Sequence, residues 1–303
     1  MALSQPKSST GSGVTNALAA YFMWGLAPIY FKLLIDIGAG EILMHRVVWS
    51  SAFLLLLVLL SKKRLVLIQL CKQPKVIAKL SLSASILAVN WLLFIWAINN
   101  NHLLDASLGY FINPLFNVAL GMMFFNERLR RNQKIAVALA GFGVFVQLFT
   151  VGSLPLVSLV LASTFAIYGV LRKKMHVDSF VGLLIESLLM LPIALLYWFY
   201  FIDSSTADLT SNSASLNFTL IMAGIVTTAP LLCFTAAAKR LTLSSLGFFQ
   251  YIGPSIMFLL ATFYYKESMQ LAEFATFIFI WLALALYSID AYRTMKKTQI
   301  PNT

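Results

Sequence analysis

Two stretches of the chain are nearly the same: SLGYFINP at residues 107–114 and SLGFFQYIGP at residues 245–254. The similarity extends toward the N-terminus, because residues 96–107 align with residues 234–245 without a gap, at a constant offset of 138. Further upstream, AAYFMWGLAPIYFK at residues 19–32 aligns loosely with STFAIYGVLRKKMH at residues 163–176. The chain therefore contains an internal repeat that covers most of its length.

The composition requires a lipid environment. Of the 303 residues, 60% are hydrophobic and only 11% are charged, and the mean hydropathy is +0.84. A helix of about 20 apolar residues crosses a hydrocarbon layer of about 30 Å, and lipid leaves no backbone amide unpaired. We therefore predict an all-α membrane protein of ten transmembrane helices at residues 14–35, 43–60, 77–99, 104–125, 134–151, 155–171, 180–201, 217–238, 245–265 and 272–292.

The basic residues predict how the chain is oriented in the membrane. A formal net charge of +11 can indicate nucleic-acid binding, but here the charges follow the predicted helix ends. With the N-terminus inside, 19 of the 22 Lys and Arg residues lie on the cytoplasmic side, including the run RKK at residues 172–174. The exceptions are Lys32, Arg46 and Lys266. This bias predicts that both termini are cytoplasmic, and it requires no nucleic-acid partner.

The two similar stretches begin the fourth and the ninth predicted helices. Five helices separate them, and an odd interval reverses the orientation of a segment. We therefore predict two inverted five-helix repeats at residues 14–151 and 152–292, between a cytoplasmic tail at residues 1–13 and a basic one at residues 293–303. Inverted repeats are typical of transporters whose substrate site lies near the bilayer midplane, where the repeats meet.

Three longer motifs resemble a known family. They are EILMHRVVWS at residues 41–50, NWLLFIWAINNNHLLDASLGYFINPL at residues 90–115 and GIVTTAPLLCFTAAAKRLTLSSLGFFQYIGP at residues 224–254. Over residues 14–295 the chain resembles the RarD-type proteins, also called chloramphenicol-sensitive or chloramphenicol-permease proteins, of the EamA group in the drug/metabolite transporter superfamily. The resemblance implies ten helices in inverted EamA repeats, a bacterial inner-membrane location, and transport of small metabolites or drugs such as chloramphenicol-like compounds.

Four polar residues share one face of the fourth predicted helix. Ser107, Tyr110, Asn113 and Asn117 follow at steps of three and four. Unpaired amides are costly in hydrocarbon, so this face meets either a neighbouring helix or a cavity, and both interpretations remain open. We name Tyr110, Asn113 and Asn117 as candidate substrate ligands. Their counterparts in the second repeat are Gln250, Tyr251 and Ser255.

A second group of substrate candidates combines aromatic rings with an amide. Asn90, Trp91 and Phe94 lie together on the third predicted helix, and Tyr21 and Trp24 lie on the first. Aromatic walls with a few amides suit small amphipathic molecules, although Trp and Tyr near helix ends more often anchor at the membrane interface. The list of candidates is completed by Tyr168.

Three prolines are hinge candidates: Pro28, Pro114 and Pro254. A proline inside a helix removes one backbone donor and frees a carbonyl one turn earlier, so the helix kinks. Such a kink serves either as a hinge for a gate or as a static bend. The second repeat has two extra residues before its proline, which predict a local bulge or a loosened turn.

Ionisable residues inside the predicted helices are few. His45 and Arg46 lie about one turn into the second helix, and Glu186 lies at a similar depth in the seventh, where the repeat alignment matches it with His45. A desolvated carboxyl group could take up and release protons as access alternates, so these three residues are candidates for proton coupling. The alternative is a structural pair, or side chains that reach the interface.

Neither a cofactor nor a metal site is expected. Cys71 and Cys233 lack metal-ligand neighbours, and the motifs of phosphate loops, dinucleotide sites and zinc hydrolases are missing from the sequence. An enzyme needs converging catalytic groups and a channel needs charged rings or filter loops, so neither is favoured. The sequence predicts a secondary active transporter that exports a small-molecule substrate by alternating access. The alternative is a non-transporting structural or regulatory membrane protein.

Overall fold

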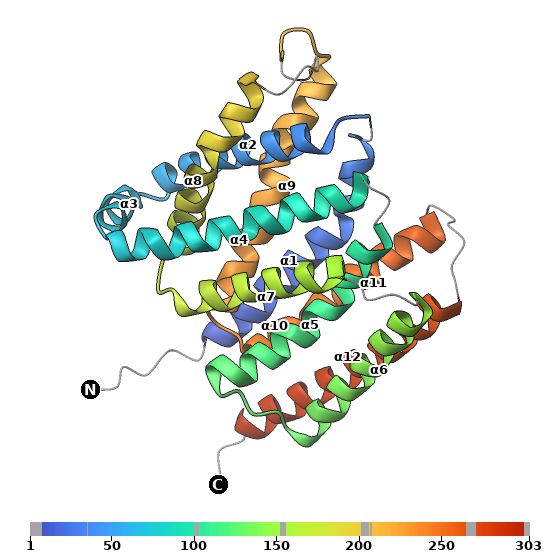
Figure 1. The fold of residues 1–303 in the computed structure, drawn as a ribbon. Coiled ribbons are helices and arrows are strands. Elements are labelled where there is room, and N and C mark those ends of the chain that lie inside the picture. Colours follow the sequence, from blue (N-terminus) through green and yellow to red (C-terminus); the bar gives the residue numbers. More distant parts are fainter. Residues whose placement is uncertain are drawn as a thin grey trace, which may run out of the picture.

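The computed structural model describes residues 8–34, 36–99, 103–151, 156–200, 206, 208–264 and 271–299. The regular structure of these residues is helical throughout (Figure 1). Its elements are α1 (Ser8–Lys32), α2 (Ala39–Leu60), α3 (Arg64–Cys71), α4 (Pro74–Asn99), α5 (Leu103–Phe125), α6 (Arg131–Val151), α7 (Leu156–Lys174), α8 (Ser179–Tyr200), α9 (Ala214–Ala238), α10 (Leu243–Gln250), α11 (Ile252–Leu259), the π-helix η2 (Leu260–Tyr264) and α12 (Leu271–Gln299).

The helices have the length and composition of membrane spans. Within the described residues, seven helices are long and apolar enough to cross a membrane, and Gly109–Phe125 of α5 is a shorter apolar helix. Every predicted apolar segment overlaps a helix, and the segment at residues 245–265 is shared by α10, α11 and η2. The chain is therefore an all-helical, multi-pass membrane protein. Helix α3 was not predicted, because its eight residues are too few to span lipid.

The second copy of the repeated stretch is interrupted. Tyr251 forms a turn between α10 and α11, and its N–H donates to the Phe248 carbonyl at 3.3 Å. This turn lies three residues before Pro254, in the stretch that is two residues longer than its first copy. By contrast, α5 continues through Pro114 and α1 continues through Pro28. The two copies therefore differ in backbone at the point where they differ in length.

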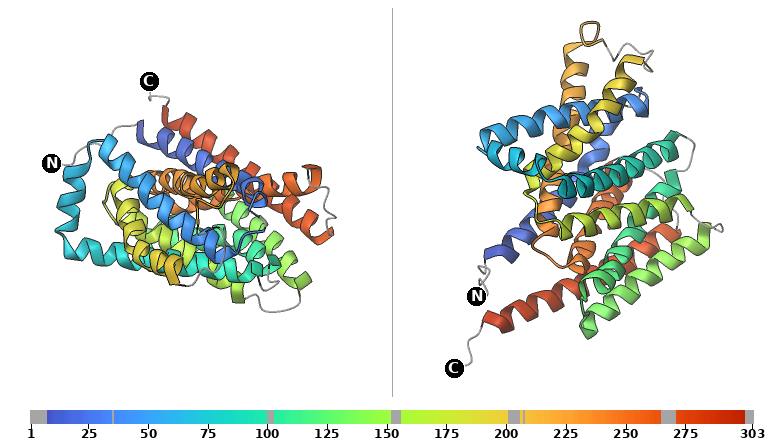
Figure 2. Two further views of the ribbon diagram at one scale, coloured as in Figure 1. Left: turned by 90° about the horizontal axis from the view of Figure 1, so that it is seen from above. Right: turned by 60° about the vertical axis from the view of Figure 1, so that its left-hand side comes forward.

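The helices pack in a regular order. Helix α2 lies between α8 and α9, α5 lies between α7 and α10, and α4 contacts both α7 and α8. Helix α1 packs on α9 and α11, while α6 and α12 lie side by side along one edge of the molecule (Figures 1 and 2). The first turn of α1 and the last turn of α12 lie on the same side of the bundle.

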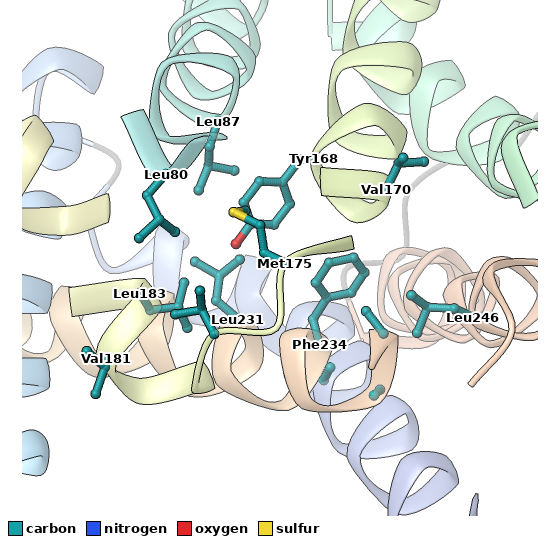
Figure 3. Packing of buried hydrophobic residues seen from close by; sticks show 14 of the residues in the cluster. Leu80, Leu87, Tyr168, Val170, Met175, Val181, Leu183, Leu231, Phe234 and Leu246 are labelled. Atoms are coloured by element: carbon teal, nitrogen blue, oxygen red, sulfur yellow. The ribbon is translucent and has the colours of Figure 1, made fainter. Parts of the chain in front are cut away.

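A buried apolar cluster joins helices from both halves of the chain (Figure 3). The rings of Tyr168 on α7 and Phe234 on α9 stack with their centroids 6.0 Å apart. Leu87 on α4 and Leu231 on α9 are buried in the same cluster. Lipid tails are as apolar as these side chains, so close packing rather than exclusion of water stabilises the helix contacts.

Glycines permit the closest of these contacts. A Cβ placed on Gly224 of α9 would lie 2.5 Å from the Trp49 backbone of α2. A Cβ on Gly247 of α10 would lie 2.8 Å from the Pro114 carbonyl oxygen of α5. Both distances are shorter than a van der Waals contact, so the helices approach each other only because these side chains are absent.

Polar contacts join the helix connections on the side of the bundle where α1 begins and α12 ends, here called the basic face. Lys63, beside α3, donates to Asp178 before α8 at 2.7 Å. Lys239, at the end of α9, donates to the Val177 carbonyl and, at 3.2 Å, to the Ser179 hydroxyl. Three connections that are distant in sequence are thereby held together.

These contacts change the acidity of the groups that make them. Burial raises the pKa of Asp178, but the Lys63 hydrogen bond and two N–H groups at the start of α8 outweigh it, so this pKa stays below its usual range. Burial, assisted by the Arg172 charge, lowers the pKa of Lys239 to about 8. The pKa values of both groups therefore depend on how this face is packed.

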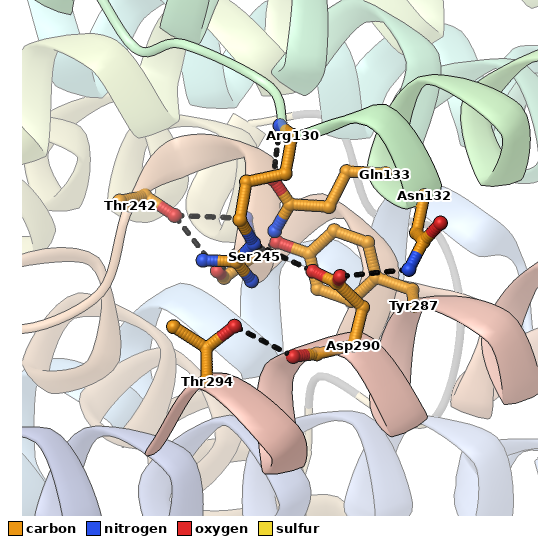
Figure 4. A network of polar contacts seen from close by, with 8 residues as sticks. All are labelled: Arg130, Asn132, Gln133, Thr242, Ser245, Tyr287, Asp290 and Thr294. Atoms are coloured by element: carbon orange, nitrogen blue, oxygen red, sulfur yellow. Dashed lines mark hydrogen bonds and ion pairs between the residues drawn. The ribbon is translucent and has the colours of Figure 1, made fainter. Parts of the chain in front are cut away.

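The α5–α6 connection is tied to the same face. The Glu127 carboxylate accepts hydrogen bonds from the N–H groups of Leu243 and Ser244 at 2.6 and 2.9 Å, where a carboxylate stabilises the beginning of α10. In a second network, Arg130 donates to Asp290 of α12 at 2.6 Å (Figure 4). The members of that network are Arg130, Asn132, Gln133, Thr242, Ser245, Tyr287, Asp290 and Thr294.

Replacement of Gly247 by alanine is expected to destabilise the protein, because the new Cβ meets backbone that cannot rotate away. Overpacking of this kind costs about 1–3 kcal/mol of unfolding free energy. The matched control is Gly141→Ala in α6, whose Cβ meets nothing within 4 Å. Thermal unfolding in detergent should show a lower midpoint for Gly247→Ala and an unchanged or slightly higher one for Gly141→Ala. Equal midpoints would contradict the close α5–α10 contact.

Candidate functional site

The predicted polar face of α5 meets neighbouring helices. Asn113 donates to the Ala162 carbonyl of α7 at 2.6 Å. Asn117 donates to Asn113 at 3.1 Å and to Gln250 of α10 at 2.9 Å. The Asn117–Gln250 bond links α5 to α10, where Gly247 also lies against the Pro114 carbonyl. In this arrangement the three amides connect helices, and their contact with a substrate stays a proposal.

The remaining candidates of the second repeat face α5 and α12. The Tyr251 hydroxyl donates to the Phe111 carbonyl at 3.2 Å. The Ser255 hydroxyl donates to the Tyr251 carbonyl at 2.8 Å and accepts from the Trp281 indole at 2.9 Å. Tyr251 is buried and Ser255 is partly buried, so each side chain stabilises the interrupted helix in the place where the backbone turns.

Candidates from α1 and α7 form one aromatic cluster. The rings of Tyr21 and Trp24 lie 5.6 Å apart, and both pack on Phe234 of α9. Tyr168 is fully buried against the same Phe234 ring. On α4, Asn90 donates to the Leu161 carbonyl at 2.9 Å and therefore joins α4 to α7.

A third group surrounds Arg46. Its Nε donates to the Thr227 hydroxyl of α9 at 2.8 Å, and its guanidinium carbon lies 4.7 Å from the centre of the Trp91 ring of α4. Tyr110 of α5 lies near enough to interact electrostatically with this cation, and its ring meets Phe94 at 5.8 Å. The structure thus brings four predicted site residues together, from α2, α4 and α5.

Glu186 forms an ion pair with Arg172, a residue that lies just outside the helix predicted at residues 155–171. Arg172 and Glu186 are each 1% exposed, and Nη1 of Arg172 lies 3.3 Å from Oε1 of Glu186. The predicted helix ended at residue 171, but α7 extends to Lys174, so Arg172 lies inside the helix and its side chain is buried. Ser83 of α4 also donates to Glu186, at 2.6 Å.

The helix opposite Arg172 is shaped for this ion pair. A Cβ on Gly182 would lie 2.6 Å from Nη1 of Arg172, so this glycine, one turn before Glu186, provides the space for the guanidinium. Nε and Nη2 of Arg172 and Oε2 of Glu186 are buried without a hydrogen-bond partner among the described residues. The pair is therefore only partly satisfied, which is unusual for buried charges.

His45 lies apart from Glu186. It is fully buried, its Nδ1 accepts from the Trp49 indole at 3.2 Å, and its ring meets the Trp198 ring edge-on at 5.0 Å. The two positions that the predicted repeat alignment matches therefore have different partners, aromatic for His45 and charged for Glu186.

A central cavity lies between α2, α4, α8 and α9. It has a volume of about 10 Å³, which is room for about one water molecule. Its lining is Val47, Ser50, Leu54, Leu87, Trp91, Leu183, Glu186, Ser187, Met190, Thr227, Thr228 and Leu231. Glu186 belongs to the ion pair, and Trp91 and Thr227 contact Arg46, so the cavity lies between the two charged groups.

Sequence reasoning found two of the lining residues, Trp91 and Glu186. It missed the hydroxyl groups of Ser50, Ser187, Thr227 and Thr228, which line the same cavity. The adjacent threonines, TT before AP in the third family-like motif, were the available signal. Hydroxyls bond easily to their own helix, so their presence alone does not predict that they face a cavity.

Comparison with known proteins decides the family. The chain is 55% identical to "Protein RarD" of Escherichia coli (strain K12) over 95% of this chain and 98% of that protein. The chain belongs to the EamA-like transporter family. The family's sequence model matches residues 11–149. This EamA-family chain is also 50% identical to an "Uncharacterized transporter" of Vibrio cholerae, over 97% of each chain.

A solved structure supports the fold of this RarD-type protein. It is described as "Crystal structure of protein", and it matches with a TM-score of 0.72 at 18% identity, covering 96% of this chain and 99% of the other. At this identity the likeness shows the fold alone. The family and the helices together make the chain a multi-pass inner-membrane transporter protein.

Single replacement of either charge in the ion pair is expected to destabilise the protein strongly. Arg172→Met or Glu186→Leu leaves one buried charge without its partner, which costs about 3–5 kcal/mol of unfolding free energy. The double variant removes both charges and should recover much of that loss. Denaturant unfolding of the four proteins in detergent gives the coupling energy. Additive losses would show that the pair is not coupled.

Proposed function

We propose that this EamA-family protein is a secondary active transporter of small amphipathic metabolites or drugs, which it exports by alternating access. The observation that carries the proposal is the position of the central cavity. Two of its walls, α2 and α4, come from the first half of the chain, and two, α8 and α9, come from the second. A site between repeats is exposed to one side or the other when the halves rock.

The packing of the helices supports two inverted repeats. Suppose that α1, α2, α4, α5 and α6 correspond to α7, α8, α9, α10–α11 and α12. The exchange then turns each main contact into another observed contact or into itself. The α1–α9 contact becomes α7–α4, α2–α9 becomes α8–α4, and α1–α11 becomes α7–α5. The pairs α2–α8, α5–α10 and α6–α12 become themselves. Such a pseudo-two-fold arrangement gives two conformations of similar energy.

The basic face supports a cytoplasmic location for both ends of the chain. Hydrogen bonds join the α2–α3, α5–α6, α7–α8 and α9–α10 connections to one another or to neighbouring helix ends on this face. These connections contain six of the 22 Lys and Arg residues, and the adjoining helix turns contain six more, Arg64, Arg131, Lys134, Arg172, Lys173 and Lys174. Short basic connections remain in the cytoplasm. If the chain crosses the membrane ten times, α1 also begins on that side and α12 also ends there.

The size of the cavity fits a closed conformation. A small organic molecule needs a pocket of about 300–1,000 Å³, far more than one water molecule requires. We infer that the contacts of the basic face close the cytoplasmic side in this conformation. Opening then requires separation of contacts such as Lys63–Asp178, which are partly exposed and therefore weak.

Flux measurements test transport. Purified protein in liposomes should move radiolabelled chloramphenicol with saturable kinetics. Ser187→Phe places a ring in the cavity and should abolish the flux, whereas Leu188→Phe, at the next position on α8 but 38% exposed, should not. Ser187→Ala, which removes only a hydroxyl at the same position, should retain flux and so show that position 187 tolerates a small change. Equal flux in all variants would contradict a route through the cavity, and its absence for every solute tested would favour a structural role.

Glu186 is the residue proposed to couple transport to protons. It faces Ser83 from α4 and Arg172 and Tyr168 from α7, so a proton on its carboxyl group weakens the ion pair and loosens this contact. Glu186→Gln mimics the protonated form and should flatten the pH dependence of flux. Asp208→Asn is the control that should retain it, because Asp208 is exposed and accepts from Thr210 within its own turn. An unchanged pH dependence in Glu186→Gln would exclude this coupling role, and the same assay applies to His45.

A further inference from the structure

Two arginines within the apolar helices have opposite surroundings. Arg172 is fully buried and has the Glu186 carboxylate as its partner. Arg46 is partly buried, and no carboxylate lies within ion-pair distance of it in the part of the chain that the structure describes. A charge among transmembrane helices is costly unless a counter-charge or water compensates it. Arg46 is thus placed as a cation whose counter-charge is not supplied by its described neighbours.

Its immediate neighbours leave the guanidinium open at its edge. The ring centres of Trp91 and Phe31 lie 4.7 and 5.7 Å from the guanidinium carbon, where their faces stabilise a cation. Nε is occupied by the Thr227 hydroxyl at 2.8 Å. The two terminal nitrogens make no hydrogen bond within the described residues. They form the fork that binds two oxygens of one carboxylate.

Arg46 does not line the central cavity itself but lies next to two residues that do. Trp91 and Thr227 contact Arg46 and also line the cavity. Tyr110 is 37% exposed, and its hydroxyl interacts electrostatically with the same cation. A molecule that entered from the cavity would meet a bidentate cation and aromatic rings within one site.

We propose that Arg46, with Trp91, Phe31, Tyr110 and Thr227, is the binding site for the carboxylate of an aromatic organic anion. This inference rests on the proposed transport function and narrows its substrate to amphipathic anions. The guanidinium supplies the counter-charge contact, and the rings supply contact area for the apolar part of the molecule.

Matched ligands test the charge requirement on the unmodified protein. Phenylacetate and phenylacetamide have nearly the same shape and differ in charge, so thermal-shift titrations of the purified full-length protein compare the carboxylate directly. Phenylacetate should stabilise the protein saturably, with a dissociation constant at least tenfold lower than that of the amide. Cyclohexylacetate, which lacks the aromatic ring, should bind more weakly. Equal affinities for acid and amide, or no stabilisation by the acid, would overturn the proposal.

Variants then assign the site. Arg46→Gln should weaken phenylacetate binding at least tenfold and leave the amide unaffected, while Arg46→Lys, which keeps the charge but loses the fork, should fall between them. Arg240→Gln is the control, since the Arg240 side chain donates only to the Ala236 carbonyl, within its own helix end, among the described residues. If Arg46→Gln does not fold, the lysine variant and the ligand comparison still decide the outcome. Wild-type affinity in both Arg46 variants would refute the site.

Measurements of binding and of flux distinguish failure of the binding-site proposal from failure of the transport proposal. Phenylacetate binding that depends on Arg46, without flux of any solute, would uphold the site and reject transport. Flux of labelled phenylacetate that is the same in wild type and Arg46→Gln would uphold transport and reject the site. A phenylmethanesulfonate titration separates a carboxylate site from one for any oxyanion, because equal binding of the sulfonate would show that the fork does not select carboxylates.

Discussion

The interior of this protein is organised by the cost of charge inside lipid. Arg172 and Glu186 are both 1% exposed, and each is tolerated only because the other is present. Their pairing requires Gly182 on α8, a hydroxyl from α4 and the inward turn of the last part of α7. A single electrostatic requirement therefore fixes the relative positions of three helices, two of which also form walls of the central cavity.

The two copies of the repeated stretch differ in their backbone structure. The first copy of the repeated stretch continues as one helix through Pro114, and the second is divided at Tyr251. Where the copies meet, Asn117 and Gln250 bond to each other, and Gly247 allows backbone contact. This interface is close-packed, and under the proposed alternating access it is the pivot about which the halves move.

The contacts of the basic face have the opposite character. Lys63–Asp178 and Arg130–Asp290 are partly exposed ion pairs, each of which contributes little to stability and exchanges easily with water. Strong, buried contacts thus lie beside the cavity, and weak, partly exposed ones lie at the face that opens in the proposed alternating access. In that proposal the gate moves without disruption of the core.

The sequence by itself determined the membrane class, the helical segments and the internal repeat, because these depend on local composition, segment length and periodicity. It also identified Trp91, Glu186 and Arg46 as unusual, since aromatic and ionisable residues within apolar helices stand out without a structure. Only the tertiary structure decided which side chains contact one another. Arg172 looked like one more charge at a helix end, and Asn113 and Asn117 could have faced a cavity or a neighbour. Which of these is true depends on how helices far apart in sequence are rotated and packed, and no local pattern contains that information.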